Sequence, residues 1–102
     1  MAEFIFHPET KDDISNAYTW YQQQAKGLGD DLLAELETAF EAINEYPEAW
    51  PRFIANTRRF LLSRFPFSVI YVPTPDMIHV VAIMHNSRKP GYWLDRLSRT
   101  VR

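Results

Sequence analysis

The chain contains no cysteine and no long apolar stretch. Without cysteine there are no disulfides, no thiolate metal ligands and no cysteine nucleophile. The N-terminal sequence MAEFIFHPETKDD lacks the basic region and apolar run of a signal peptide, and no segment reaches the roughly 18 apolar residues of a membrane span. We therefore expect a cytoplasmic protein that does not insert into membranes and uses neither a metal nor another cofactor.

Glycine is also scarce, with three residues in the chain. Two of them form Gly27-Leu28-Gly29, which follows an expected helix rather than a strand and precedes acidic residues, so it is not a phosphate-binding loop. Apolar material is plentiful, because 46% of the 102 residues are hydrophobic and 15% are aromatic. One core can be built from this material, and we expect a single domain over residues 1–102.

Charge is divided unevenly along the sequence. Residues 1–50 hold eleven acidic and two basic residues, whereas residues 51–102 hold nine basic and two acidic ones, although the net charge is -2. Such an asymmetry permits an anionic ligand on the second half of the chain. It also permits the two halves to attract each other in the fold, and the sequence leaves both interpretations open.

We expect the other elements of the fold to be arranged around the segment from Phe65 to Trp93. It holds two apolar runs rich in β-branched and aromatic residues, separated by Pro73-Thr74-Pro75-Asp76. This pattern predicts an antiparallel hairpin of two strands that lie in the middle of a sheet. A polar, cationic segment follows the hairpin, and loops at the ends of buried strands are common places for function.

Simple alternation along the second strand of this hairpin predicts which side chains share a face. The two sets are Ile78, Val80, Ala82 and Met84 on one face, and Val81 and Ile83 on the other, with His79 and His85 of the same parity as each other.

The remaining elements follow from periodicity and turn residues. We predict a first strand at Glu3–His7 and a helix that begins at Pro8. A break at Lys26–Asp30, with Asp30 as N-cap, leads to a second helix whose apolar stripe includes Leu33. We predict a strand at 57–63 and a short last helix at 94–99, within a tail at 94–102 that frays.

The resulting order is strand, helix, helix, strand, strand, strand. It predicts an α+β domain of two layers, in which a helical hairpin packs on a mainly antiparallel four-stranded sheet.

Several short motifs accompany this order of elements. They are Phe6-His7-Pro8, Gly27-Leu28-Gly29-Asp30, Pro47-Glu48-Ala49-Trp50-Pro51, Arg58-Arg59-Phe60-Leu61-Leu62 followed by Phe65-Pro66-Phe67-Ser68-Val69-Ile70-Tyr71, and His85 to Arg88 with Pro90, Gly91 and Trp93. In this arrangement the sequence resembles the RelE/ParE superfamily of bacterial toxins, the toxic halves of type II toxin-antitoxin pairs in plasmid stabilisation modules. The resemblance runs from about residue 3 to residue 93.

The resemblance implies a partner and a target. The partner is a cognate antitoxin that folds on binding and forms a hetero-oligomer with the toxin. The target divides the superfamily, because relatives of RelE cut messenger RNA on the ribosome, whereas relatives of ParE bind DNA gyrase and cut nothing. The sequence favours the ParE-like branch. A third interpretation is a protein that has lost toxicity and binds its antitoxin alone.

In the RelE-like case the protein is a metal-independent endoribonuclease. Such cleavage needs a base, an acid and fixed cations, and the resemblance places these roles on His85, Arg64, Arg88 and Tyr92. The acidic net charge and the absence of lysine from the central strands count against this case. Each of the four side chains also has a simple structural role open to it.

In the ParE-like case the protein needs a binding surface. The target-binding residues are then in the cationic, aromatic segment after the hairpin: Arg88, Lys89, Tyr92, Trp93 and Arg96. An antitoxin needs exposed apolar area, for which the candidates are Trp20, Tyr21, Trp93, Leu94 and Leu97. The alternative is that these apolar side chains close the protein's own core.

Overall fold

A computed structural model describes residues 3–100, with side chains through residue 97. The elements are β1 (Glu3–Phe6), α1 (Pro8–Gln24), α2 (Leu28–Glu45), β2 (Arg58–Leu61), β3 (Phe67–Pro73), β4 (Met77–His85) and α3 (Leu94–Thr100). The predicted order of elements is confirmed, and the predicted last helix is present as α3. Residues 101–102 of the tail expected to fray lie outside the described residues.

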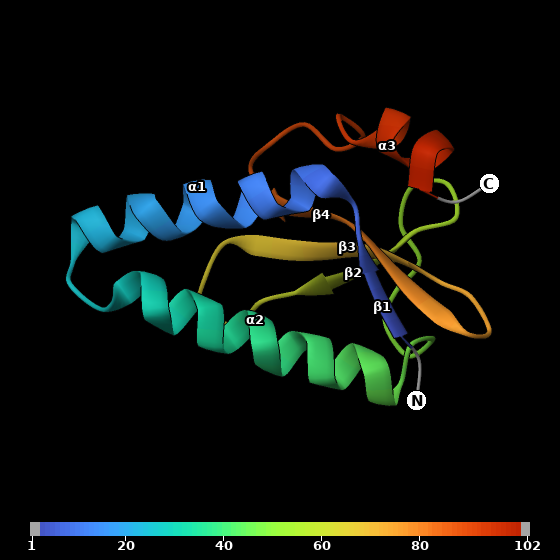
Figure 1. The fold of residues 1–102 in the computed structure, drawn as a ribbon, viewed down its shortest axis with the longest axis horizontal. Coiled ribbons are helices and arrows are strands. Elements are labelled where there is room, and N and C mark those ends of the chain that lie inside the picture. Colours follow the sequence, from blue (N-terminus) through green and yellow to red (C-terminus); the bar gives the residue numbers. More distant parts are fainter. Residues whose placement is uncertain (1–2, 101–102) are drawn as a thin grey trace.

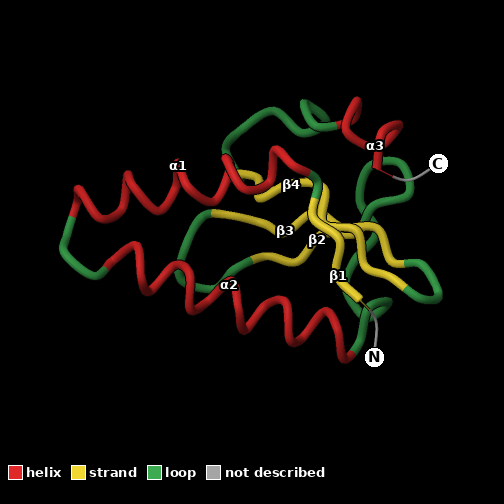
Figure 2. Tube along the Cα trace, in the orientation of Figure 1, coloured by secondary structure: helices red, strands yellow, loops and turns green. Residues whose placement is uncertain are grey.

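The four strands form one sheet in the order β1-β4-β3-β2. β1 is parallel to β4, and the other two pairs are antiparallel. α1 and α2 form an antiparallel hairpin that covers one face of the sheet (Figures 1 and 2). The predicted α+β class is therefore confirmed, with β3 and β4 in the middle of the sheet as expected. None of the helices in residues 3–100 combines the length and apolar character needed to cross a bilayer.

Apolar side chains fill both faces of the sheet. Between the hairpin and the sheet, Leu36 and Ile43 of α2 pack with Val69 and other buried residues of the central strands. On the other face, the fully buried Trp93 packs with a smaller cluster that Phe53 and other side chains cover. The segment before α3 and the loop before β2 therefore close the face that the helical hairpin leaves open.

The register of β4 against β3 shifts by one residue at Val81, which forms a β-bulge. Val81 and Ala82 therefore both lie on the face away from the helical hairpin, whereas Ile83 lies on the face that the helices cover. The simple alternation predicted from the sequence is wrong here, because the bulge adds one residue to the period. Past the bulge, His85 lies on the helix side of the sheet, opposite to His79.

The turn between the two helices differs from the prediction. Gly27, not Asp30, is the N-cap of α2, and it has the left-handed φ of 87° that favours glycine. Because the chain reverses at Gly27, the helix starts at Leu28 and Asp30 lies inside its first turn. There Asp30 accepts a hydrogen bond from the hydroxyl of Tyr18 at 3.2 Å.

Gly29 permits the close approach of α2 to α1. A Cβ atom at this position would lie 2.7 Å from the backbone oxygen of Tyr18, which is too close for any other residue. The two helices therefore touch through backbone at their shared end.

The last residues of β4 extend beyond β1, whose pairing ends at Val80. Beyond that point Asp13 of α1 bonds to the edge of β4. Its Oδ2 accepts the Ile83 N–H at 3.1 Å and a guanidinium N–H of Arg96 at 2.9 Å. Arg96 donates a second bond to the Val81 carbonyl at 3.0 Å. One carboxylate thus joins α1, β4 and α3, and it satisfies backbone groups that an open strand edge would leave unpaired.

We expect Asp13→Ala to lower the free energy of unfolding by about 3 kcal/mol, because the substitution removes the closest carboxylate from a buried guanidinium, which Glu9 approaches only to 3.7 Å. Urea denaturation followed by far-ultraviolet circular dichroism measures the change. Asp12→Ala is the matched control, because Asp12 is an exposed neighbour on the same helix, and it is expected to change stability by no more than about 0.5 kcal/mol. Equal losses in the two variants would contradict the role given to Asp13.

Candidate functional site

Two adjoining hollows open where the end of β4 meets α1, with volumes of 370 and 230 Å³. They share Ala17, Phe67 and His85, and we call them together the His85 cleft. The first hollow is also lined by Trp20, Tyr21 and Pro66, and the second by Asp13, Asn16, Ile83, Arg88 and Tyr92. The cleft therefore has an aromatic half and a charged half.

His85 lies between these two halves. Its ring packs edge-on against Phe67 with the ring centroids 5.0 Å apart, and its Nδ1 accepts the Ser87 N–H at 3.1 Å. A neutral histidine that accepts at Nδ1 carries its proton on Nε2. In this arrangement the Nε2 side of His85 is the one left to form a hydrogen bond in the cleft.

Arg88 and Tyr92 are engaged with each other. The guanidinium carbon of Arg88 lies 3.6 Å from the centroid of the Tyr92 ring, a cation–π contact. Burial and the nearby charge of Asp13 raise the pKa of Tyr92, and Arg88 and Arg96 oppose that rise. Tyr92 is therefore a neutral phenol at physiological pH, which offers a flat surface and a hydroxyl rather than a charge.

Three of the four residues assigned to RNA cleavage thus meet in the cleft, and Arg64 does not. Arg64 lies beyond β2, where its guanidinium is 3.5 Å from the Asp31 carboxylate. Its backbone N–H also donates to Glu35. Arg64 therefore lies beside α2 and outside the His85 cleft.

The five residues after β4 that were expected to bind a target are not all exposed. Arg88, Lys89 and Leu94 are exposed, but Trp93 is 0% and Arg96 7% exposed. The expectation of exposure is wrong for Trp93 because its indole fills the second face of the sheet and donates to the Met84 sulfur at 3.4 Å.

The same expectation is wrong for Arg96, whose guanidinium binds the Asp13 carboxylate. The pKa of Arg96 is raised: burial lowers it, but the hydrogen bond and charge of Asp13 outweigh that effect. Arg96 is a structural cation in this fold.

The candidate antitoxin contacts lie in two environments. Trp20 is 55% exposed and packs edge-on against Tyr21 with the centroids 4.9 Å apart. Tyr21 is half-buried, with its ring 5.0 Å from that of Phe65. Leu97 is half-buried against the second cluster. The exposed part of this set is therefore Trp20 with Leu94.

An apolar groove that sequence reasoning missed runs between α1 and α2, with a volume of 550 Å³. Phe6 and Leu33 lie in it and are 43% and 40% exposed. Leu33 was expected on the buried stripe of α2, but it lies at the edge of that stripe, where the two helices separate. Alternation along β1 places Phe4 and Phe6 on one face, and this signal pointed to an apolar surface there.

No group of three or more His, Cys, Asp or Glu side chains among the described residues is arranged to hold a metal ion. The side chains that line the cleft offer hydrogen bonds, aromatic surfaces and positive charge.

We expect Arg88→Gln to raise the pKa of Tyr92 further, because the charge and hydrogen bond of Arg88 both lower it. A pH titration of protein with ¹³C-labelled tyrosine rings, followed by NMR, measures this pKa separately from those of the other tyrosines. Lys89→Gln also removes one positive charge, at the next position in the sequence, and is expected to leave the pKa of Tyr92 unchanged. An unchanged pKa in Arg88→Gln would show that the two side chains do not meet in solution.

Comparisons with known proteins agree with this fold. A solved structure described as "Chromosomal ParDE TA system from P. aeruginosa" has the same fold, with a TM-score of 0.62 at 16% sequence identity over 83% of this chain and 96% of that chain. No curated protein matches the sequence. The sequence pattern of the family described as "ParE toxin of type II toxin-antitoxin system, parDE" matches residues 4–90. With most of its length matched, the chain belongs to the ParE toxin family of type II toxin-antitoxin systems.

Proposed function

We propose that this protein arrests growth by binding DNA gyrase and that a cognate antitoxin neutralises it by folding onto its surface. The target contacts are proposed on the charged half of the His85 cleft and on the exposed residues that follow β4. The antitoxin contacts are proposed in the groove between α1 and α2 and around Trp20. The working action of the toxin is then binding, with no chemical step of its own.

The observation that carries this proposal is that the residues RNA cleavage would need are not arranged around one phosphate. Arg64 lies outside the cleft on the α2 side of the molecule, and within the cleft Arg88 already stacks on Tyr92. One ring nitrogen of His85, Nδ1, is engaged by a backbone N–H. A metal-free nuclease needs base, acid and cations aligned around one phosphate. This arrangement favours the gyrase-binding branch over the nuclease branch.

The exposed residues around the cleft have the composition of a protein-binding surface. Arg88 and Lys89 are exposed cations, and Tyr92 lies beneath Arg88 as a half-buried aromatic platform. Leu94 is 42% exposed next to them. Arginine and tyrosine are the residue types that most often dominate binding energy at interfaces. Trp93 and Arg96 support this surface from below instead of contacting a target directly.

The groove between α1 and α2 has the properties of a site for a segment that folds on binding. It is open and mainly apolar. A bound segment that covers the exposed side chains of Phe6 and Leu33 removes their apolar surface from water, which favours binding. Lys11 is the one charged residue that lines it among the described residues. An amphipathic segment with an acidic residue placed to meet Lys11 fits this combination of an apolar floor and a single cation.

We expect Arg88→Ala to weaken inhibition of gyrase supercoiling by the purified protein, with a loss of binding free energy of roughly 2 kcal/mol, as for an interface arginine. The same variant is expected to slow growth less on induction in cells without antitoxin. Lys26→Ala, an exposed cation in the turn between the helices, is the control and is expected to remain fully inhibitory. Loss of protein synthesis with cleaved message, rather than loss of supercoiling, would replace this proposal with the nuclease function.

We expect Leu33→Asp to weaken antitoxin binding while leaving gyrase inhibition intact, because it places a charge on the apolar floor of the groove. Calorimetric titration with the antitoxin encoded beside the toxin measures the affinity. Leu61→Asp is the matched control, because Leu61 is 56% exposed on β2 outside the groove. Equal affinity in the two variants would move the antitoxin site elsewhere on the molecule.

A further inference from the structure

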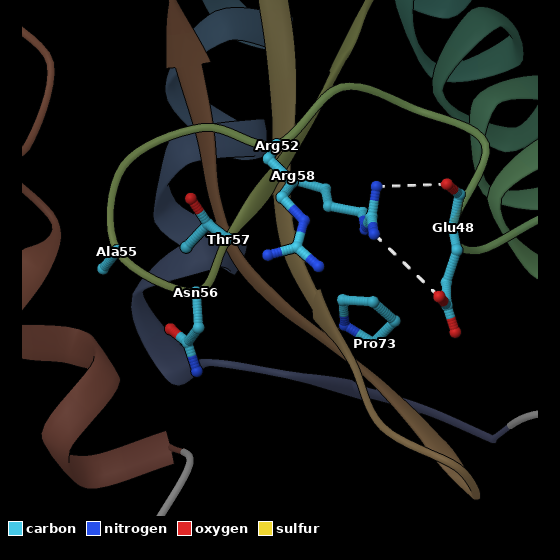
Figure 3. A pocket seen from close by; sticks show the side chains of 7 residues that line it. All are labelled: Glu48, Arg52, Ala55, Asn56, Thr57, Arg58 and Pro73. Atoms are coloured by element: carbon cyan, nitrogen blue, oxygen red, sulfur yellow. Dashed lines mark hydrogen bonds and ion pairs between the residues drawn. The ribbon is translucent and has the colours of Figure 1, made fainter.

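A separate hollow of 240 Å³ lies between the loop that follows α2 and the start of β2. Arg52, Asn56 and Arg58 line it, with Glu48 and Pro73 at its rim (Figure 3). It contains no residue of the His85 cleft or of the α1–α2 groove. Neither proposed interface accounts for it.

The loop that forms this hollow is held rigidly. Its start is fixed by the Tyr71 hydroxyl, which donates to the Pro47 carbonyl at 2.7 Å. Burial raises the pKa of Tyr71 to about 12, so this hydroxyl remains a donor across the physiological range. Its end is fixed by the bonds from Phe53 N–H to the Thr57 carbonyl at 2.9 Å and from Thr57 N–H to the Ile54 carbonyl at 3.2 Å.

The turn of this loop contains backbone strain. Ala55 has a φ of 58°, in the left-handed region that residues with a side chain rarely adopt. A strained residue persists only where the surrounding structure holds it, and such residues gather at ligand sites. At Ala55 the strain tightens the turn that closes the hollow.

Two arginines are forced together in this hollow. Arg52 and Arg58 are directly opposite each other in an isolated antiparallel β-bridge, so their side chains leave the backbone on one face. Both side chains line the hollow, and Figure 3 shows the guanidinium of Arg58 turned toward Glu48. Like charges directly opposite each other destabilise a strand pair. The fold therefore maintains a local concentration of positive charge at a cost to its own stability.

The charge of this pair is only partly neutralised within the described residues, because one carboxylate, that of Glu48, lines the hollow with two arginines. Arg58 is fixed in place because its Nη1 donates to the carbonyls of Glu48 at 3.0 Å and Trp50 at 2.7 Å. The Glu48 carboxylate is 4.0 Å from Arg58, but its side chain is 80% exposed, and such pairs are weak. Among the described side chains, none accepts a hydrogen bond from the guanidinium of Arg52.

We propose that this hollow binds a single carboxylate group presented by another polypeptide, with the guanidinium of Arg52 as the main donor and Arg58 as the fixed neighbouring charge. The planar fork of an arginine side chain matches the two oxygens of a carboxylate. A nucleic acid backbone fits less well, because phosphates that follow the one bound at the arginines would face the Glu48 carboxylate at the rim. The expected ligand is thus an acidic side chain or a C-terminal carboxylate of a protein.

The test uses acetyl-glutamate amide as probe, with acetyl-glutamine amide as its uncharged equivalent. NMR spectra of the ¹⁵N-labelled full chain are recorded during titration, including the arginine side-chain N–H groups. Saturable shifts are expected at residues 48–58 with the glutamate probe. The glutamine probe is expected to bind at least about tenfold more weakly, which corresponds to about 1.4 kcal/mol.

Arg52→Gln is expected to remove the saturable shifts. Because Arg52 is exposed, the substitution is expected to leave the fold intact, and the same spectra check this. Lys26→Gln removes one charge at a distant exposed site and is expected to retain them. Equal shifts with the two probes, or retained shifts in Arg52→Gln, would overturn the proposal. Tighter binding of inorganic phosphate than of acetyl-glutamate amide would overturn the choice of a carboxylate.

Discussion

The carboxylate of Asp13 is the point on which the architecture depends. β1 pairs only with the first part of β4. Beyond the end of β1, Asp13 accepts the backbone N–H of Ile83 and binds Arg96. Arg96 in turn donates to Val81, the residue of the β-bulge. A helix, the central strand and the last helix therefore share one buried ion pair, and such a pair tolerates the loss of neither member.

The β-bulge links this constraint to the proposed site. Without the extra residue at Val81, His85 would have the parity of the side chains on the far face of the sheet. With it, His85 lies on the helix side against Ala17 and Phe67. Bulges beside functional sites commonly redirect a side chain in this way. The same bulge presents the Val81 carbonyl to Arg96, so the position of the cleft and the attachment of α3 have one structural cause.

The sequence predicts the order of elements and the central position of β3 and β4, because both depend on local signals: turn prolines, helical stripes and strands apolar on both faces. The site is predicted less well. Trp93 and Arg96 are an aromatic and a cation after the last strand, and nothing local distinguishes a binding pair from the buried cover of the second face. The ion pair between Arg64 and Asp31 joins segments that are far apart in the sequence, so local patterns do not predict it. The groove depends on where two helices separate, which periodicity alone does not state.

The parallel pairing of β1 with β4 has a consequence for how the toxin is made. The hydrogen bond between Asp13 and Ile83 joins residues 70 positions apart, so the first helix lacks this anchor on the sheet until the last strand has been made. Contacts of such long range form late and slowly. The His85 cleft, which is lined by α1 and by the end of β4, is therefore among the last parts of the fold to be completed.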